Sequence, residues 1–424
     1  MSQAQSWFEL PNGSWSLLLP LLAGAGALSL LLRGALALLS AWHVRRPRPA
    51  LLRAPPVTVL KPLRGLDDGL EDNLASLLQQ DYPGPLQFVF GVTAADDPAL
   101  AVVRRLQRRF GARRSDVALG RDDAAHNPKV ANLLGMLPYA QHDALLISDS
   151  NVRVAPDYLR AMVAELAPAD VGLVANPVVG TDAQTLGAAC EALQLGGVIA
   201  GAVSCGAWVG HPCVIGKSML LRRDALARIG GLQRFGDVLA EDYAMGQAMV
   251  RAGLRVVTCG YVVATHAGAW TMRRFAARHL RWCQMRRWIA PWAYLGEPLL
   301  LPSCWWLALA SLAVLTAAGW GWPLVAAAAI AVSCGVEAGC SQALRGLWRV
   351  REVAATPCKD AVLLGLWALA WIRREVQWRG HHYRIGPGSR LRPVRARGGV
   401  APAAADPPLP PLSAAAGSIG AAAR

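Results

Sequence analysis

The stretch that decides the fold class is Ile147-Ser148-Asp149-Ser150-Asn151-Val152-Arg153. The apolar run at 144–147 ends abruptly in Asp149 and Asn151, which is typical of a buried parallel strand that brings acidic side chains to the carboxyl edge of a sheet. The ligand sites of open α/β sheets lie at that edge. A carboxylate there, in a strongly basic protein, indicates a divalent cation that holds a phosphorylated ligand.

The composition favours a membrane protein. The 424 residues are 54% hydrophobic and yet carry a formal net charge of +15, which fits a chain that faces anionic lipid headgroups or an anionic substrate. A nucleic-acid-binding protein could share the charge but would not need the long uncharged segments described below, so we expect no nucleic-acid partner. The nine cysteines are scattered without a CxxC pair, which argues against a zinc site and a disulfide framework.

The first apolar segment, residues 14–42, contains only one charged residue, Arg33. It is long enough to span a bilayer as one helix, although a buried helix of a soluble domain is the alternative. Glu9 is the only charged residue in the preceding segment 1–13. Four arginines follow the apolar segment: Arg45, Arg46, Arg48 and Arg53. The positive-inside rule therefore predicts an outer N-terminus and a cytosolic domain after the helix, which in a bacterium places the protein in the inner membrane.

A second apolar region, residues 298–336, has no charged residue and predicts two transmembrane helices joined by a turn at 319–323. Arginines at 345, 349 and 351 return the chain to the cytosol. Within the following segment, 345–388, the apolar run at 361–372 is only about a dozen residues long, which predicts a cytosolic, interfacial or re-entrant element rather than a span. The tail at 398–424 is rich in Ala, Pro and Gly and is predicted to be disordered.

Residues 55–270 alternate between strand and helix patterns. Strands are predicted at 57–60, 87–92, 144–147, 171–174, 255–257 and 262–264, and helices at 67–80, 100–110 and 223–229. Such alternation predicts an α/β domain with a doubly wound, mainly parallel sheet. The glycine- and alanine-rich stretch 196–210 has no clear period and is predicted to line an acceptor pocket.

Acidic residues follow two of the predicted strands. Asp96 and Asp97 follow one and Asp149 follows the other, and their carboxylates are the hard ligands that Mg²⁺ or Mn²⁺ prefers. Aspartates that merely cap turns are the alternative for either group alone. Lys129 and Lys217, two of only four lysines, are candidates to contact phosphate, with solvated lysines as the alternative.

Asp242, preceded by Glu241, begins a predicted helix after a glycine-containing loop. A helix N-cap explains such an acid, but the position also suits a general base that accepts a proton from a hydroxyl.

The segment 271–295 is predicted to be a basic interfacial helix whose tryptophans and arginines lie at the membrane surface. Within it, Arg278 and Arg281 offer guanidinium groups for a departing diphosphate, next to Trp282. A plain membrane-surface helix is the alternative reading, and it is the one we prefer for Arg274, Arg286 and Arg287.

Together these positions resemble a known signature. Asp97, Asp149, Asp242 and Arg278-x-x-Arg281-Trp282 match the D, D, D, (Q/R)xxRW pattern of lipid-acting glycosyltransferases of families 2 and 21. Further motifs look like those of the ceramide glucosyltransferase family: Leu60-Lys-Pro-Leu-Arg-Gly65, Gln80-Asp-Tyr-Pro83, Asp96-Asp-Pro-Ala99, Asn127-Pro-Lys129, Ile147-Ser-Asp-Ser150, Cys213-Val-Ile-Gly216 and Trp378-Arg-Gly-x-x-Tyr-Arg384.

The resemblance implies a GT-A nucleotide-sugar domain at 55–270, flanked by transmembrane helices, that transfers a sugar with inversion. It implies that Asp97, with Asp96 and Lys129, binds the nucleotide sugar and that Asp242 is the base. Asp149 would bind the metal, Mg²⁺ or Mn²⁺, and the diphosphate, while Arg281 and Trp282, with Arg278, would hold the diphosphate and the acceptor. Asn151 stands where relatives often carry an acid or a glycine, so metal coordination would rest on Asp149 alone.

The resulting hypothesis is a membrane glycosyltransferase that transfers glucose from UDP-glucose to the hydroxyl of ceramide or a similar lipid. Its partners would be the UDP-sugar, the lipid acceptor and the bilayer. A hopanoid or other lipid N-acetylglucosaminyltransferase is the alternative within the same class. A catalytically inactive membrane scaffold is the alternative from another class, disfavoured by the intact acidic positions.

Overall fold

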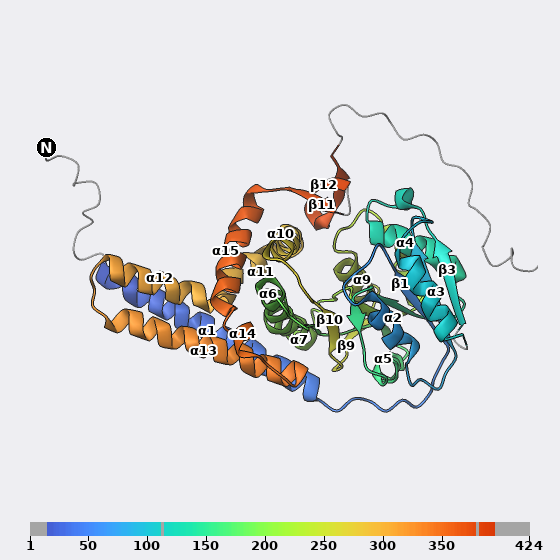
Figure 1. Cartoon of the computed structure of the whole chain (residues 1–424), viewed down its shortest axis with the longest axis horizontal. Helices are drawn as coiled ribbons and strands as arrows, with labels where there is room; N and C mark the ends of the chain where they lie inside the picture. The colour runs from blue at the N-terminus through green and yellow to red at the C-terminus, as the bar shows by residue number, and fades with distance from the viewer. Residues whose placement is uncertain (1–14, 112–113, 379–380, 395–424) are drawn as a thin grey trace, which may run out of the picture.

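The computed structural model describes residues 15–111, 114–378 and 381–394. The predicted outer N-terminus at 1–13 and the predicted tail at 398–424 lie outside the described residues. An α/β domain forms one end of the molecule, and a helical bundle projects from the other. Further helices, which belong to neither part, lie between the domain and the bundle (Figure 1).

A seven-stranded mixed sheet forms the centre of the α/β domain, in the order β3-β2-β1-β4-β8-β6-β9. Every neighbouring pair is parallel except those made by β8, which runs antiparallel to β4 and β6. Strands β1, β2, β4 and β6 are wholly buried, which explains their continuous apolar sequences. The seven strands are β1 (Val57–Pro62), β2 (Leu86–Val92), β3 (Arg114–Leu119), β4 (Ala144–Ser148), β6 (Val171–Ala175), β8 (Ser218–Arg222) and β9 (Arg255–Thr258).

Helices cover both faces of this sheet, as a doubly wound fold requires. One hydrophobic cluster joins the sheet to α2 (Leu70–Leu78), α3 (Ala99–Arg109) and α5 (Tyr158–Leu166). The other joins it to α4 (Pro128–Met136), α8 (Arg223–Arg228) and α9 (Glu241–Arg251). The predicted α/β domain with a mainly parallel sheet is confirmed.

A smaller sheet lies next to the acidic stretch 147–153. It contains β5 (Val152–Arg153), β10 (Val263–His266) and β7 (Val178–Thr181) in that order. Because β5 begins only three residues after Asp149, its pairing with β10 fixes where the chain leaves the edge of the main sheet.

The glycine-rich stretch at 196–210 is helical, in contrast to its aperiodic sequence. Helix α6 (Leu186–Gln194) continues through a π-helical turn, η3 (Leu195–Ile199), into α7 (Ala200–Trp208). The small residues allow close packing, since a Cβ on Gly201 would lie 3.0 Å from the Cβ of Leu36. A longer helix, α10 (Met272–Ile289), packs against α6 and is followed by α11 (Pro291–Leu295).

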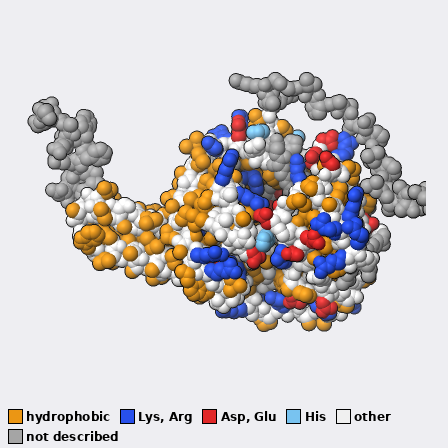
Figure 2. Space-filling view, in the orientation of Figure 1, with side chains coloured by type: hydrophobic (Ala, Val, Ile, Leu, Met, Phe, Trp, Pro, Cys, Tyr) orange, Lys and Arg blue, Asp and Glu red, His pale blue; other side chains and the backbone are white. Residues whose placement is uncertain are grey.

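Three apolar helices form the projecting bundle: α1 (Trp15–Arg45), α12 (Pro302–Leu315) and α13 (Gly321–Arg345). Figure 2 shows that the far end of this bundle is almost entirely hydrophobic, whereas Lys and Arg gather over the rest of the molecule. In the part of the chain that the structure describes, four helical stretches are long and apolar enough to cross a membrane: 17–45, 186–208, 321–345 and 350–372.

The segment after the bundle is helical over a longer range than its apolar run, and its predicted interfacial or re-entrant place stays a prediction. Helix α15 (Thr356–Ile372) begins five residues before the apolar run at 361–372, directly after α14 (Val350–Val353). Its first turns are buried despite two charged residues, because the Lys359 ammonium lies 2.8 Å from the Asp360 carboxylate and 3.5 Å from that of Glu337. Glu337 also pairs with the fully buried Arg33 at 2.6 Å, so this charge network ties α1, α13 and α15 together.

The last described residues form a sheet that was not predicted from the sequence. Strands β11 (Glu375–Trp378), β12 (His381–Ile385) and β13 (Leu391–Pro393) form an antiparallel meander that packs against α10. Six short helical turns complete the described elements: η1 (Asp122–Ala124), η2 (Leu137–Tyr139), η4 (Leu232–Phe235), η5 (Glu297–Leu300), η6 (Pro387–Ser389) and the π-helical η3.

Candidate active site

A cavity of about 1140 Å³ lies where the α/β domain meets the helices. Its polar part lies at the carboxyl edge of the sheet, and six of the predicted site residues line it: Lys129, Asp149, Asp242, Arg278, Arg281 and Trp282. Its apolar part is lined by side chains from α1, η3, α7, α11 and α15, among them Leu36, Ile199, Val203, Ala293, Leu363 and Trp367. Residues of the 196–210 stretch therefore line a cavity, and their predicted role in holding an acceptor stays a prediction.

Asp149 is surrounded by lysines. Its two carboxylate oxygens lie 2.9 Å from the Lys129 ammonium and 3.0 Å from that of Lys217, and Lys61 donates to its backbone oxygen at 2.5 Å. Burial alone would raise the pKa of Asp149, but Lys129 and Lys217 lower it well below its ordinary value. Asp149 is therefore a permanent anion at the centre of a cationic pocket.

Asp242 faces this cluster from the first turn of α9. Its carboxylate accepts hydrogen bonds from the backbone N–H groups of Gly216 at 2.5 Å and Tyr243 at 2.8 Å. Ala240, rather than Asp242, is the N-cap residue, so the capping alternative does not apply. Burial and the neighbouring Glu241 carboxylate raise the pKa of Asp242 to about 7, against the opposing effect of Lys129. A carboxylate with such a pKa is well matched to proton transfer near neutral pH.

Local structure places Lys129 between these acids. The Asn127 side chain caps α4 by accepting hydrogen bonds from the backbone N–H groups of Lys129 and Val130. The Lys129 ammonium then donates to the backbone oxygen of Gly216 at 2.7 Å and lies 3.2 Å from Glu241. The Asn-Pro-Lys motif thus acts as a helix start that carries a buried cation.

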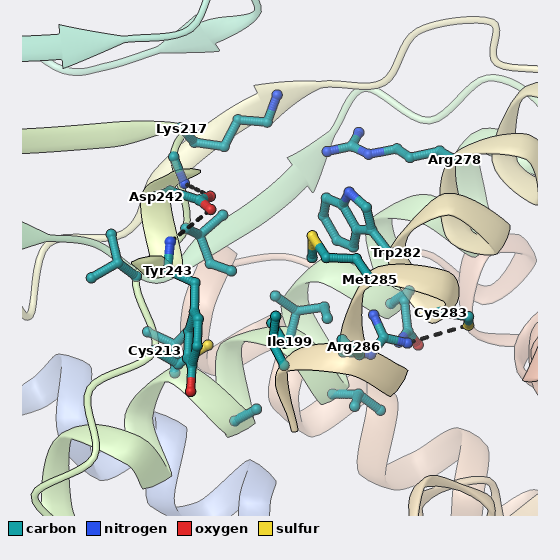
Figure 3. A pocket seen from close by; sticks show the side chains of 18 of the residues that line it. Ile199, Cys213, Lys217, Asp242, Tyr243, Arg278, Trp282, Cys283, Met285 and Arg286 are labelled. Carbon is teal, nitrogen blue, oxygen red and sulfur yellow. Dashed lines mark hydrogen bonds between the residues drawn. The ribbon is translucent and has the colours of Figure 1, made fainter. Parts of the chain in front are cut away.

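Arg278 faces the sheet edge from α10, on the opposite side of the cavity. Figure 3 shows Arg278, Trp282 and Met285 on one side and Lys217 and Asp242 on the other. The Arg278 guanidinium lies 4.5 Å from the ring centroid of Trp282, in cation–π geometry. Helix α10 packs against α6, α15 and the C-terminal sheet and has six buried residues: Phe275, Arg278, His279, Cys283, Gln284 and Arg287. Its predicted place at the membrane surface stays a prediction.

Glu191, on α6, was missed by the sequence analysis. Its fully buried carboxylate lies 2.7 Å from the Arg278 guanidinium and 2.8 Å from the His279 ring. The available signal was that Glu191 is the only charged residue in the apolar stretch 186–208. A lone carboxylate in such a stretch implies a buried cationic partner.

The other arginines of α10 have local partners. Arg281 lies 5.7 Å from the ring of Trp378 on β11, and both residues line the cavity. Arg286 pairs with Glu297 at 2.5 Å, and Arg274 lies 4.3 Å from the ring of Trp270. Arg274 is nevertheless exposed, whereas Arg286 is partly buried, and the predicted contact of either residue with lipid headgroups stays a prediction.

Asp96 and Asp97 do not line the cavity. The Asp97 carboxylate accepts hydrogen bonds from the backbone N–H groups of Gly65 at 3.0 Å and Ala99 at 2.9 Å. It therefore holds the loop after β1, in which Gly65 has a φ of +66°. Asp96 is exposed beside it. The nucleotide-binding role of both residues stays a prediction.

A divalent cation fits this site in a limited way. No group of three His, Cys, Asp or Glu side chains suited to a metal occurs within residues 15–111, 114–378 and 381–394. Asp149 lines the cavity with a quarter of its side chain exposed, and Asn151 is engaged by Lys217 at 2.8 Å. One carboxylate together with substrate phosphates is a usual ligand set for Mg²⁺, so Asp149 could contribute one ligand once the lysines turn to the phosphates.

Comparisons with known proteins identify the family of this chain. The chain is 28% identical to ceramide glucosyltransferase 1 of Caenorhabditis elegans. The match covers 61% of this chain and 54% of the relative, so this chain spans about half the length of that relative. It is 24% identical to the ceramide glucosyltransferase of Pyricularia oryzae, over 78% of this chain and 85% of the other.

Among solved structures, a mannosyltransferase from Pyrobaculum calidifontis in complex with GDP-Man and Mn²⁺ aligns with a TM-score of 0.45. That alignment has 20% identity and covers 81% of this chain and 98% of the other. The family model "Glycosyl transferase family 21" matches residues 24–391, most of the chain. The chain therefore belongs to glycosyltransferase family 21.

Proposed function

We propose that this protein transfers a hexose, glucose from UDP-glucose, to the hydroxyl of ceramide or a similar lipid, with inversion at the anomeric carbon. The observation that carries the proposal is the single cavity that joins a cationic site with a buried carboxylate to an apolar chamber between membrane-type helices. A nucleotide-sugar diphosphate suits the cationic end, and an acyl or sphingoid chain suits the apolar end.

The diphosphate of the donor would lie among Lys129, Lys217 and Arg278. Guanidinium and ammonium groups form charge-assisted hydrogen bonds with phosphate oxygens and stabilise the charge that develops on the leaving UDP. Trp282 stacks against Arg278 and shields it from water on one side. A divalent cation held by Asp149 and the diphosphate would supply additional Lewis-acid stabilisation of the leaving group.

Asp242 would act as the general base. Asp242 lines the same cavity as the apolar residues of the chamber, so a lipid held in the chamber could present its hydroxyl to this carboxylate. Removal of the hydroxyl proton by Asp242 generates the nucleophile, which attacks the anomeric carbon from the side opposite to UDP. One displacement of this kind inverts the configuration.

The direct test is an assay of the purified full-length protein with UDP-glucose or UDP-N-acetylglucosamine and with ceramide or hopanoid acceptors. We expect glucosylceramide from UDP-glucose and ceramide. Transfer only of N-acetylglucosamine, or only to a hopanoid, would replace the proposed donor or acceptor, and no transfer with any pair would refute the enzymatic function.

Two variants separate the base from general structural effects. Asp242→Asn should lower kcat by about 10²–10⁴-fold while UDP still binds, because general base catalysis contributes that factor. Asp143→Asn is the matched control, since Asp143 is almost fully exposed and does not line the cavity. Unchanged turnover of Asp242→Asn would remove Asp242 from the mechanism.

We further propose that the protein resides in a bacterial inner membrane with its α/β domain in the cytosol. The arginines that follow α1 support this orientation. A reporter that is active only in the cytosol should be active when it is fused after Val394. Activity of a periplasm-specific reporter at the same position would overturn the orientation.

A further inference from the structure

The Trp-Arg-Gly-x-x-Tyr-Arg motif at 378–384 has no role in the proposed chemistry, and it belongs to a sheet that lies after the last membrane-type helix. That sheet, β11 to β13 with the turn η6, contacts the loop 236–240, which leads directly into Glu241 and Asp242. The two segments are about 150 residues apart in the sequence.

Ser389 makes the central contacts. Its backbone oxygen accepts a hydrogen bond from the Leu239 N–H at 2.9 Å, and its hydroxyl oxygen accepts one from the Ala240 N–H at 3.1 Å. Ser389 is fully buried and has a φ of +56°, which is unusual for a residue with a side chain. The chain thus keeps a strained backbone at the position from which its hydroxyl reaches the N-cap residue of α9.

Neighbouring groups complete the attachment. The Leu391 N–H donates to the backbone oxygen of Asp237 at 2.7 Å, and Val238 and Arg390 form an antiparallel bridge. The Arg390 guanidinium also lies 2.5 Å from the Asp237 carboxylate. Residues 389–391 therefore act as a short additional strand along the loop 236–240.

The Asn-Pro-Lys motif holds the same loop from its other side. The Asn127 side chain donates to the backbone oxygen of Val238 at 2.7 Å and to the Glu241 carboxylate at 3.0 Å. Its backbone N–H donates to the backbone oxygen of Gly236 at 2.7 Å. The loop is thus fixed between α4, which carries Lys129, and the C-terminal sheet.

The same sheet also contacts α10. The Gln284 side chain donates to the backbone oxygens of Arg373 and Glu375 at 3.0 Å each. Leu239 packs in one hydrophobic cluster with Val376, Tyr383, Ile385 and Leu391, against which Met285 and Trp288 of α10 also pack. The C-terminal sheet therefore joins the helix that carries Asp242 to the helix that carries Arg278 and Arg281.

We propose that Ser389 is a positioning residue, which sets the start of α9 and with it the place of the Asp242 carboxylate relative to Arg278 and Arg281. The inference rests on the proposed role of Asp242. Without the hydroxyl, the buried Ala240 N–H loses its partner, and the first turn of α9 gains freedom at the point where Asp242 must meet the acceptor.

The test uses two substitutions in the full-length protein. Ser389→Gly removes the hydroxyl and suits the left-handed backbone, whereas Ser389→Ala removes the hydroxyl and keeps the strain. Both should lower kcat by about tenfold, equivalent to roughly 1.4 kcal/mol of barrier, with an unchanged Kd for UDP. Arg392→Ala, an exposed change three residues further along, is the control and should leave kcat unchanged.

Hydrogen exchange provides a readout that does not depend on the reaction. Amides of residues 238–243 should exchange faster in Ser389→Gly than in the parent protein, while those of β4 should not change. If the parent protein shows no transfer, the proposed function fails, and the exchange measurement still tests whether Ser389 orders the loop. Unchanged exchange, or a loss of UDP affinity in place of kcat, would overturn the inference.

Discussion

The pH dependence of the reaction should depend on Glu241, which does not itself touch the reacting atoms. Burial and the Glu241 carboxylate raise the pKa of Asp242 to about 7, and a general base works only when deprotonated. In the parent protein, kcat/KM should therefore fall as the pH falls through about 7, by about tenfold for each further pH unit.

Glu241→Gln should move this midpoint downward. The substitution removes a negative charge beside Asp242, and it also frees the Lys129 ammonium, which lies 3.2 Å from Glu241, to stabilise the Asp242 carboxylate. Both effects favour the charged form of Asp242, so they have the same sign. A like charge at this range is worth about one pKa unit, or roughly 1.4 kcal/mol, so the midpoint should fall to about 6.

The assay is the rate of sugar transfer between pH 5 and 9 at subsaturating donor. Asp143→Asn, which removes an exposed carboxylate, should keep the parent midpoint. The melting temperature of Glu241→Gln needs to be compared in parallel, because its amide cannot accept from both Lys129 and Asn127 as the carboxylate does. An unchanged or higher midpoint in a folded variant would refute the assignment of Asp242 as the titrating base.

Three further substitutions test other parts of the site and the bundle. Glu191→Gln should lower kcat/KM by about 10- to 100-fold, because the substitution leaves the buried Arg278 without its counter-ion. Glu191→Asp keeps the charge and should retain more of the parent kcat/KM than Glu191→Gln, and steady-state kinetics measures both variants. Ile199→Trp should fill the apolar chamber and raise the KM for the lipid, while the Kd for UDP measured by calorimetry stays the same. Leu186→Trp, at a half-exposed position, should leave the KM for the lipid unchanged. Arg33→Met should destabilise the bundle by about 3–5 kcal/mol, because its buried partner carboxylate loses the closest cation, and thermal unfolding in detergent would detect this.

The sequence was most informative where burial alone determines the structure. Strands β1, β2, β4 and β6 are apolar runs because both faces of the sheet are covered. The positions of Asp149, Asp242, Arg278, Arg281 and Trp282 around one cavity were predicted from the family signature and are found together.

Features that depend on distant partners could not be predicted in this way. The direction of β8 is set by its neighbours β4 and β6, because the pattern of an apolar strand is the same in both directions. The C-terminal strands are only three to five residues long and are held by Leu239 and α10, so their sequences carry little signal of their own. Similarly, the apolar run at 361–372 did not reveal that α15 begins at Thr356, because Lys359 and Asp360 are buried through an ion pair rather than exposed.

The environment of Asp242 links the two halves of the cavity. Burial raises its pKa, and the apolar chamber that would admit a lipid adjoins the same position. A lipid in the chamber would displace remaining water and further disfavour the charged carboxylate, so the base would become stronger when the acceptor is present. The Lys129 ammonium, which lies between Asp149 and Glu241, lowers the pKa of Asp242 and so opposes this effect. If Lys129 turned to the diphosphate of a bound donor, the acceptor and the donor together would make Asp242 more basic than either substrate alone.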